Sequence, residues 1–259
     1  MNSQTDRLID IVRKLRSPDG CPWDREQTHH SILSCFLDEL YEFFETVEQN
    51  DYEHMKEELG DLLLQIVLHT QMASEQKMFD FNDVASDISD KLIRRHPHVF
   101  DSVEVSSTKE VTNNWEKIKK GEKGKEHRKY IVDDIPEALP ALFRAEKVQR
   151  RVARVGFDWN DSRAAFDKVD EEIKEFREAL LSGKHEHAFE ELGDIVFALV
   201  NVARHHNISA EDALRNTTRK FIRRFKFIED KFKENGHEIQ NSTLEQMDIY
   251  WEESKRIVG

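Results

Sequence analysis

An internal duplication is the feature that most restricts how this chain of 259 residues can fold. A shift of 133 residues aligns Asp38–Val67 with Glu171–Val200 without a gap, and 12 of the 30 positions are identical. Nearer the C-terminal end of each copy, Trp115 aligns with Trp251. Unrelated amphipathic helices share leucines, but they do not share acids, a glycine and a tryptophan in one register. We therefore expect two tandem copies of one structural unit.

Both copies are predicted to be helical. Residues 23–96 and 141–259 contain no proline and are rich in Glu, Lys, Leu and Ala, which favour helix. Within Ile32–Val47 and Met55–Ile66, apolar residues recur at spacings of three and four. No strong alternating pattern indicates a strand. The predicted fold class is all-α, with antiparallel helical hairpins packed as tandem bundles.

A basic segment separates the two copies. Residues 117–129 include seven basic and two acidic side chains together with two glycines. This composition is typical of a solvated, flexible linker, although a flap that attracts phosphate is an alternative. The predicted organisation is an N-terminal helical domain over 1–116, a basic linker over 117–135 and a C-terminal catalytic domain over 136–259.

Charge and composition argue against several classes of protein. The 52 acidic and 39 basic residues give a net charge of -13, which disfavours direct binding to nucleic acid. No run approaches the roughly 18 uncharged residues of a membrane span, so no membrane association is expected. Cys21 and Cys35 are too few for a disulfide framework, and the first thirty residues do not resemble a secretion signal. We therefore expect a cytoplasmic protein.

Each copy also carries two acidic pairs at the same spacing. They are Glu39, Glu42, Glu58 and Asp61 in the first copy, and Glu172, Glu175, Glu191 and Asp194 in the second. Residues three apart share a helix face, and a turn at 49–51 or 182–184 folds the two helices antiparallel. Both pairs of each copy are therefore expected to face the gap between its helices.

Four carboxylates in one cleft repel one another unless they take up protons or cations. Hard divalent cations suit such oxygen ligands, Mg²⁺ first and Mn²⁺ as a substitute. The pattern contains no Cys or His, which argues against zinc and against a di-iron centre. A solvated acidic face is the alternative for a single motif, but the duplication disfavours it. Gly60 and Gly193 each cost about 1 kcal/mol inside a helix, which a close ligand, a neighbouring helix or a tight core contact would explain.

Cations and an aromatic residue follow the acids in each copy. In the second copy Lys220 and Arg224 are one helical turn apart, as are Trp251 and Lys255. Such donors suit a phosphate chain, and the indole suits stacking on a base. Ordinary surface cations and a core tryptophan are the alternative. Recurrence of the same pairs in the first copy favours the nucleotide interpretation.

Taken together, these motifs resemble the MazG family of nucleoside triphosphate pyrophosphohydrolases over essentially the whole chain. The segments that carry the resemblance are Cys21–Thr28, the Glu-Glu-Leu-Gly-Asp blocks at 57–61 and 190–194, Arg94–Phe100, Leu139–Leu142 and Val155–Trp159. The resemblance implies an all-α fold whose four-helix core is completed by dimerisation. A homodimer is expected, and pairing of the two copies within one chain is the alternative.

The resemblance also implies an activity: Mg²⁺-dependent hydrolysis of nucleoside triphosphates (ribo- or deoxyribo-) to the monophosphate and pyrophosphate, in house-cleaning or stress-related nucleotide control. The implied catalytic metal ligands are Glu172, Glu175, Glu191 and Asp194, with a second site at Glu39, Glu42, Glu58 and Asp61. The residues implied around the nucleotide, ATP included, are Lys168, Glu171, Glu190, Lys220, Arg224, Trp251 and Lys255. The C-terminal copy is expected to be the principal catalytic one, and Glu171 or Glu175 is expected to orient the attacking water.

Two other interpretations remain open. The chain is alternatively a nucleotide-sensing or protein-interaction module with little turnover, acting with a regulatory protein partner. A hydrolase restricted to deoxyuridine or modified triphosphates would share the same acids and differ only in its base pocket.

Overall fold

The computed structural model describes residues 3–120 and 129–258, and every regular element within them is a helix. The chain divides into two compact units, Met1–Lys125 (unit one) and Glu126–Gly259 (unit two). The predicted all-α class with a repeated helical unit is therefore confirmed. None of the described helices has the length and apolar character needed to cross a bilayer.

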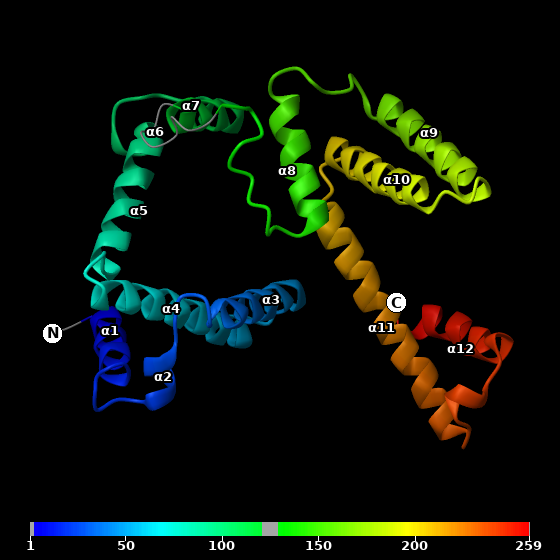
Figure 1. The fold of residues 1–259 in the computed structure, drawn as a ribbon, viewed down its shortest axis with the longest axis horizontal. Helices are drawn as coiled ribbons and strands as arrows, with labels where there is room; N and C mark the ends of the chain where they lie inside the picture. Colours follow the sequence, from blue (N-terminus) through cyan, green and yellow to red (C-terminus); the bar gives the residue numbers. More distant parts are fainter. Residues whose placement is uncertain (1–2, 121–128, 259) are drawn as a thin grey trace. The chain divides into compact units, whose positions relative to one another are not determined.

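Unit one is organised around a helical hairpin. Its described helices are α1 (Gln4–Leu15), α2 (Pro22–Glu26), α3 (Leu33–Gln49), α4 (Tyr52–Glu75), α5 (Phe81–Arg95), α6 (Pro97–Phe100) and α7 (Thr108–Lys120). Helices α3 and α4 lie antiparallel, as Figure 1 shows. Asn50 ends α3 in the left-handed region (φ 56°), and the Asp51 side chain caps α4 by accepting a hydrogen bond from the His54 amide (3.2 Å). The turn therefore lies where the sequence predicts it.

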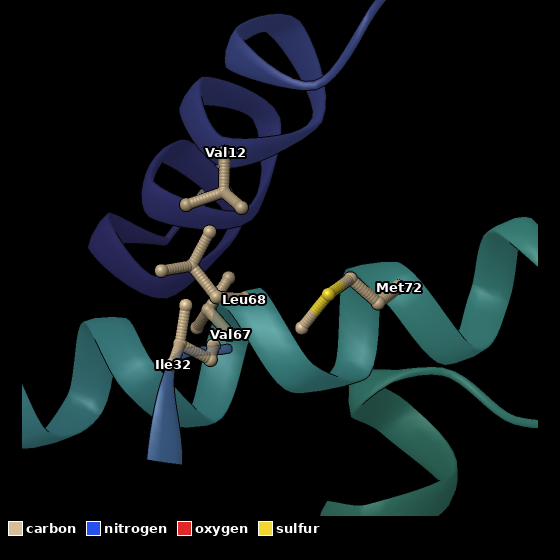
Figure 2. Close-up of a cluster of buried hydrophobic side chains, with 5 residues drawn as sticks. All are labelled: Val12, Ile32, Val67, Leu68 and Met72. Atoms are coloured by element: carbon tan, nitrogen blue, oxygen red, sulfur yellow. The ribbon is translucent and has the colours of Figure 1, made fainter. Parts of the chain in front are cut away.

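The core of unit one lies where α1 crosses α4. Val12 of α1 packs against Val67, Leu68 and Met72 of α4, with Ile32 at the start of α3 beside them (Figure 2). These side chains are all at most 5% exposed. Burial of a side chain of this kind stabilises a fold by roughly 1.5–3 kcal/mol. The cluster therefore fixes one end of α4, the helix that carries half of the unit's acidic quartet.

Unit two repeats this hairpin. Its described elements are α8 (Ala141–Ala153), α9 (Ser162–Leu181), α10 (His185–His205), α11 (Ala210–Glu234), the 3₁₀ helix η1 (Ile239–Asn241) and α12 (Leu244–Ile257). Helices α9 and α10 form the antiparallel pair, and α12 folds back along α11 (Figure 1). Gly183 supplies the positive φ (70°) of the hairpin turn. Helix α8 is tied to α10 because the Gln149 side-chain amide donates to the Phe197 carbonyl (2.8 Å).

The hairpin of unit two packs through small side chains. Ala165 and Val169 of α9 meet Ala198 and Val202 of α10, and Ile173 lies against this cluster. Small residues allow two helix backbones to approach closely. The acids that lie nearer the hairpin turn, after this cluster on α9 and before it on α10, are therefore brought near one another.

The segment predicted as a linker, 117–135, is helical at its first described residues and forms a turn at its last ones. Helix α7 extends to Lys120, so residues 117–120 are helical. After the segment 121–128, which lies outside the described residues, the amides of Lys129 and Tyr130 donate to the Asp133 carboxylate (2.7 and 2.9 Å). The Arg151 guanidinium of α8 donates to the Asp133 carbonyl. The domain limits at 116 and 136 stay predictions.

Both hairpins keep apolar side chains uncovered. Val47, Leu59 and Ile66, which belong to the apolar spacing of the first copy, are 44%, 49% and 38% exposed. In unit two, Leu192 and Val196 are 48% and 39% exposed. The helical period was therefore a sound guide to structure, but part of each apolar stripe is not covered within its own unit.

Candidate active site

The acids of unit one converge across its hairpin. Glu39 of α3 and Glu58 and Asp61 of α4 each place a carboxylate oxygen within 4.8 Å of the other two, and we call them the first acidic cluster. Glu42, the fourth predicted member, is exposed and lies outside this set of oxygens. One oxygen of Glu58, Oε2, is buried without a hydrogen-bond partner. A buried carboxylate oxygen without a donor is costly, so this atom is suited to a cation.

Electrostatic strain marks the first acidic cluster. Burial raises the pKa of Glu39, and the charges of Asp61, Glu42 and Glu58 raise it further. Burial also raises the pKa of Glu58, with Glu42 and Asp61 adding to the effect. Glu42 is therefore near enough to act on both groups although it is outside the closest set. A cation placed among these oxygens would relieve the repulsion.

The acids of unit two converge in the same way but with different membership. Glu172 and Glu175 of α9 and Glu191 of α10 have oxygens within 4.8 Å of one another, and we call them the second acidic cluster. Glu172 and Glu191 are buried, whereas Glu175 and Asp194 are exposed. Asp194 lies outside the closest set, yet its charge contributes to raising the pKa of Glu191, after burial and the charges of Glu175 and Glu172.

A lysine is part of the second acidic cluster's surroundings. The Lys168 ammonium lies 2.6 Å from Glu172 Oε1 and 2.9 Å from Glu171 Oε1. These two carboxylates hold the pKa of Lys168 above its usual value, the Glu172 hydrogen bond having the larger effect. Two of the predicted nucleotide neighbours, Lys168 and Glu171, are therefore next to a predicted metal ligand. Glu190, a third, is exposed and lies 3.9 Å from His187 Nδ1.

His187 was not singled out from the sequence. Its Nδ1 lies 3.2 Å from Glu191 Oε1, one helical turn away. The aligned residue of unit one, His54, instead lies 2.7 Å from Asp51, whose hydrogen bond raises the pKa of His54. Lys184 occupies the position of Asp51 in unit two, so no such carboxylate holds His187 there. The signal in the sequence was the four-residue spacing from His187 to Glu191, which recurs from His54 to Glu58.

The remaining predicted nucleotide residues form a second group on α11 and α12. The Arg224 guanidinium lies over the Trp251 ring, with 5.8 Å from its carbon to the ring centroid, and Phe221 packs against the same ring at 5.2 Å. Arg224 Nε is buried without a hydrogen-bond acceptor. Lys255 forms an ion pair with Glu252, one turn earlier on α12. Lys220 lies on α11, four residues before Arg224.

Unit one repeats the arginine and tryptophan pair. The Arg95 guanidinium carbon lies 5.0 Å from the Trp115 ring centroid, and the Lys119 ammonium lies 4.7 Å from it. The stacking of a cation on an indole is favourable by about 0.5–1 kcal/mol at exposed sites. The duplication therefore preserves this arrangement as well as the acids.

The two helical glycines have open space beside them. A methyl group built on Gly60 or Gly193 meets no described atom within 4 Å outside its own stretch of helix. The tight core contact that the sequence left open as an explanation is therefore wrong for both glycines. Approach of a ligand or of another helix remains as the explanation.

Both acidic clusters fit a hard divalent cation. Each described cluster consists of three carboxylates whose oxygens lie close enough to share one ion, and it contains no Cys or His. In unit one the unpartnered Glu58 oxygen adds a specific argument. In unit two, two of the three carboxylates, Glu172 and Glu191, are buried and the third, Glu175, is exposed, so this set could also hold such an ion.

Comparison with known proteins gives a consistent result. A family model described as the MazG nucleotide pyrophosphohydrolase domain matches residues 27–100 and 162–228, which contain the two acidic clusters. The chain is 45% identical over 260 residues to the nucleoside triphosphate pyrophosphohydrolase of Escherichia coli strain K12, covering 98% of both chains. It is 43% identical over 250 residues to the nucleoside triphosphate pyrophosphohydrolase/pyrophosphatase MazG of Thermotoga maritima, covering 96% of this chain and 95% of the relative.

One solved structure is also similar. The crystal structure of a mazG-related protein from Thermotoga maritima is 28% identical, covers 44% of this chain and 98% of its own, and aligns with a TM-score of 0.39.

Proposed function

The chain belongs to the MazG nucleotide pyrophosphohydrolase family, and from this premise we propose that the second acidic cluster is its principal catalytic centre. The chain is a nucleoside triphosphate pyrophosphohydrolase, a hydrolase that acts on a triphosphate anhydride. The observation that carries the assignment is the convergence of three carboxylates, two of them buried, inside a matched family domain.

Glu172, Glu175, Glu191 and Asp194 are the proposed ligands of a divalent metal. Enzymes of this family depend on metal ions, and the chain provides acidic clusters of suitable chemistry. We assign Mg²⁺ as the natural ion, with Mn²⁺ as a substitute, because all the donors are hard oxygens. When bound, the ion supplies charge neutralisation for the triphosphate and acidifies a water molecule.

The side chains divide the remaining tasks. A carboxylate that is not fully engaged with metal, Glu171 or the exposed Glu175, accepts a proton from the water that attacks the α-phosphorus. Attack breaks the bond to the β-phosphate oxygen, which leaves as pyrophosphate. Arg224, whose Nε is buried without an acceptor, donates to this departing charge. Lys220 on α11 and Lys255 on α12 are the other proposed donors to the phosphate chain.

Trp251 is the proposed stacking surface for the base. Its ring contacts both Phe221 and Arg224, so it is oriented before any nucleotide arrives. Aromatic stacking accepts every base, which suits an enzyme that removes surplus or non-canonical nucleotides. A role in house-cleaning or stress-related control of nucleotides follows from that breadth.

The first acidic cluster is the proposed second metal site. It retains all four acids of the family pattern, but Tyr41 and Cys35 stand where unit two has Lys174 and Lys168. The exchange at position 35 removes the positive charge that Lys168 places beside Glu172 in unit two. We therefore assign the principal turnover to unit two.

A homodimer is the proposed assembly. The exposed apolar residues of the hairpins, such as Leu59 and Ile66 in unit one and Leu192 and Val196 in unit two, need a cover that a second chain supplies. Light scattering after size exclusion tests this, and a mass near 30.6 kDa would contradict it. The free cysteines Cys21 and Cys35 support a reducing, cytoplasmic location.

Product analysis tests the proposed reaction. The purified chain is incubated with a panel of ribo- and deoxyribonucleoside triphosphates, with Mg²⁺, with Mn²⁺ and with EDTA. We expect monophosphate and pyrophosphate in equal amounts, and none in EDTA. Release of orthophosphate would contradict the assigned position of attack, and tight nucleotide binding without turnover would favour a sensing module instead.

A further inference from the structure

Lys168 forms an ion pair with Glu172, one of the proposed metal ligands. Its ammonium is 2.6 Å from Glu172 Oε1 and 2.9 Å from Glu171 Oε1, and both partners lie on the same helix, α9. Glu172 is buried, with only 6% of its side chain exposed, whereas 36% of the Lys168 side chain is exposed. The ammonium therefore places a positive charge beside an oxygen that a metal ion would also bind.

Unit one lacks this lysine. The shift of 133 residues places Cys35 on Lys168, while it places Glu39 on Glu172 and Glu58 on Glu191. Cys35 is a free, half-buried thiol, so it does not neutralise Glu39 as an ammonium does. The two clusters therefore share their carboxylates and differ in one positive charge at one position.

We propose that Lys168 couples metal binding to nucleotide binding at the second acidic cluster. In the absence of nucleotide its ammonium neutralises Glu172, and when a triphosphate arrives with its metal the ammonium moves from Glu172 to the phosphate chain. This inference rests on the proposed function of the cluster and deepens it.

The side chain has the properties that such a transfer requires. Lysine carries a compact charge on a flexible four-carbon stem, so its ammonium can change partners without movement of the helix. Its partial exposure gives it access to a phosphate at the opening of the site. A metal ion that binds alone must share Glu172 with a like charge, which weakens its binding. A triphosphate removes that opposition because it offers the ammonium a new partner.

The coupling is reciprocal. If nucleotide strengthens metal binding by releasing Lys168, metal must strengthen nucleotide binding by the same factor. The ammonium loses its phosphate partner only when the products of hydrolysis leave the site, and it then returns to Glu172, where its charge would again oppose a bound cation. The first acidic cluster, with Cys35, has no comparable coupling.

Binding of Mn²⁺ alone, measured by electron paramagnetic resonance of the full-length chain, tests this proposal. The first cluster is inactivated by E39Q, E58Q and D61N so that only the second is observed. In this background K168M, which keeps the aliphatic stem, is expected to tighten Mn²⁺ binding by about tenfold, within the range typical of coupled sites. A non-hydrolysable triphosphate analogue is also expected to strengthen Mn²⁺ binding. The factor of this strengthening should be about tenfold smaller in K168M than in the parent.

Two variants serve as controls. K174M removes the same charge from α9, but Lys174 lies near Glu178 (4.0 Å) and is largely exposed, so Mn²⁺ binding is expected to change by less than about twofold because of screening. In the reverse experiment the second cluster is inactivated by E172Q and E191Q, and C35K is expected to weaken Mn²⁺ binding to the first cluster by about tenfold.

The outcomes separate this proposal from the proposed function. If Mn²⁺ binds to the second cluster and E172Q removes it, but K168M and K168Q leave the affinity unchanged or weaken it, the coupling is wrong and the metal site stands. If no Mn²⁺ binds to the second cluster even with the triphosphate analogue, the metal site is wrong and the coupling fails with it. Circular dichroism checks that each variant retains its helices.

Discussion

Arg224 lies over the ring of Trp251, with its guanidinium carbon 5.8 Å from the ring centroid, and Arg95 and Trp115 repeat this relationship in unit one at 5.0 Å. We expect W251A to raise KM for nucleoside triphosphates by about tenfold, because stacking on a base is worth about 1–3 kcal/mol. Steady-state kinetics with Mg²⁺ measures the effect. W251F, which keeps a ring, should retain most of the affinity.

The aligned tryptophan provides the control for this prediction. W115A removes the same side chain from unit one and is expected to change KM much less, since the principal turnover is assigned to unit two. Trp251 also packs against Phe221 (5.2 Å), so thermal unfolding is measured in parallel. A loss of stability with an unchanged KM would mean that Trp251 is only a packing residue.

The raised pKa values of Glu39 and Glu58 predict how metal-free stability depends on pH. The folded chain holds protons on these groups above their ordinary pKa of 4.5, so folding is opposed increasingly as pH rises from 4.5 through the raised values. The amides of E39Q and E58Q mimic the protonated acids. The double variant should therefore match the parent near the lower end of this window and become more stable than the parent as pH increases.

Differential scanning calorimetry in EDTA measures this difference. Comparison of the double variant with the parent at each pH cancels the titration of groups that do not interact with Glu39 or Glu58. Excess Mg²⁺ should then stabilise the parent more than the variant, because ligand binding favours the folded state and the variant keeps only the second acidic cluster. A stability difference that stays constant from pH 5 to pH 8 would contradict the account of the first acidic cluster.

The open space beside Gly193 predicts opposite effects on stability and activity. Alanine meets no described atom there, so G193A is expected to increase the free energy of unfolding by about 0.5–1 kcal/mol, as removal of a helical glycine does. If the glycine exists to admit a ligand or a second chain, kcat/KM falls although stability rises. Urea unfolding and pyrophosphate release measure the two quantities, and G60A is the matched variant in unit one. Unchanged activity in G193A would leave the glycine without a functional explanation.

Local patterns predicted the hairpins well. The turn residues Asn50 and Gly183 and the apolar spacing of the flanking segments depend on short-range preferences, so the sequence located them correctly. The duplicated register also predicted that acids from both helices of each hairpin come together, because residues three apart on a helix share a face.

Membership of each cluster depended on more than spacing. Glu42 lies outside the closest set in unit one, whereas the aligned Glu175 lies inside it in unit two; Asp61 and Asp194 differ in the opposite sense. The spacing of the acids is the same in both copies, so spacing alone does not decide which carboxylates come closest.

Which side chains are buried was harder to predict than which segments are helical. Leu59 and Ile66 fit the apolar period of α4, yet they are exposed, while Val67 and Leu68 on the same helix form the core with α1. Amphipathic spacing identifies an apolar face without specifying which helix covers it. The ion pair from Lys168 to Glu172 was readable from its four-residue spacing, but its consequence emerged only once Glu172 was found to be buried.

The acids of unit two are the proposed metal site at which the triphosphate is hydrolysed. Pyrophosphate release in Mg²⁺ by E191Q, with E58Q as the matched variant of unit one, tests it most directly. We predict that E191Q lowers kcat by about 10³-fold, since metal assistance is worth several kcal/mol and each 1.36 kcal/mol is a factor of ten, while E58Q retains most of the turnover. Full activity in E191Q, or a loss confined to E58Q, would contradict the claim.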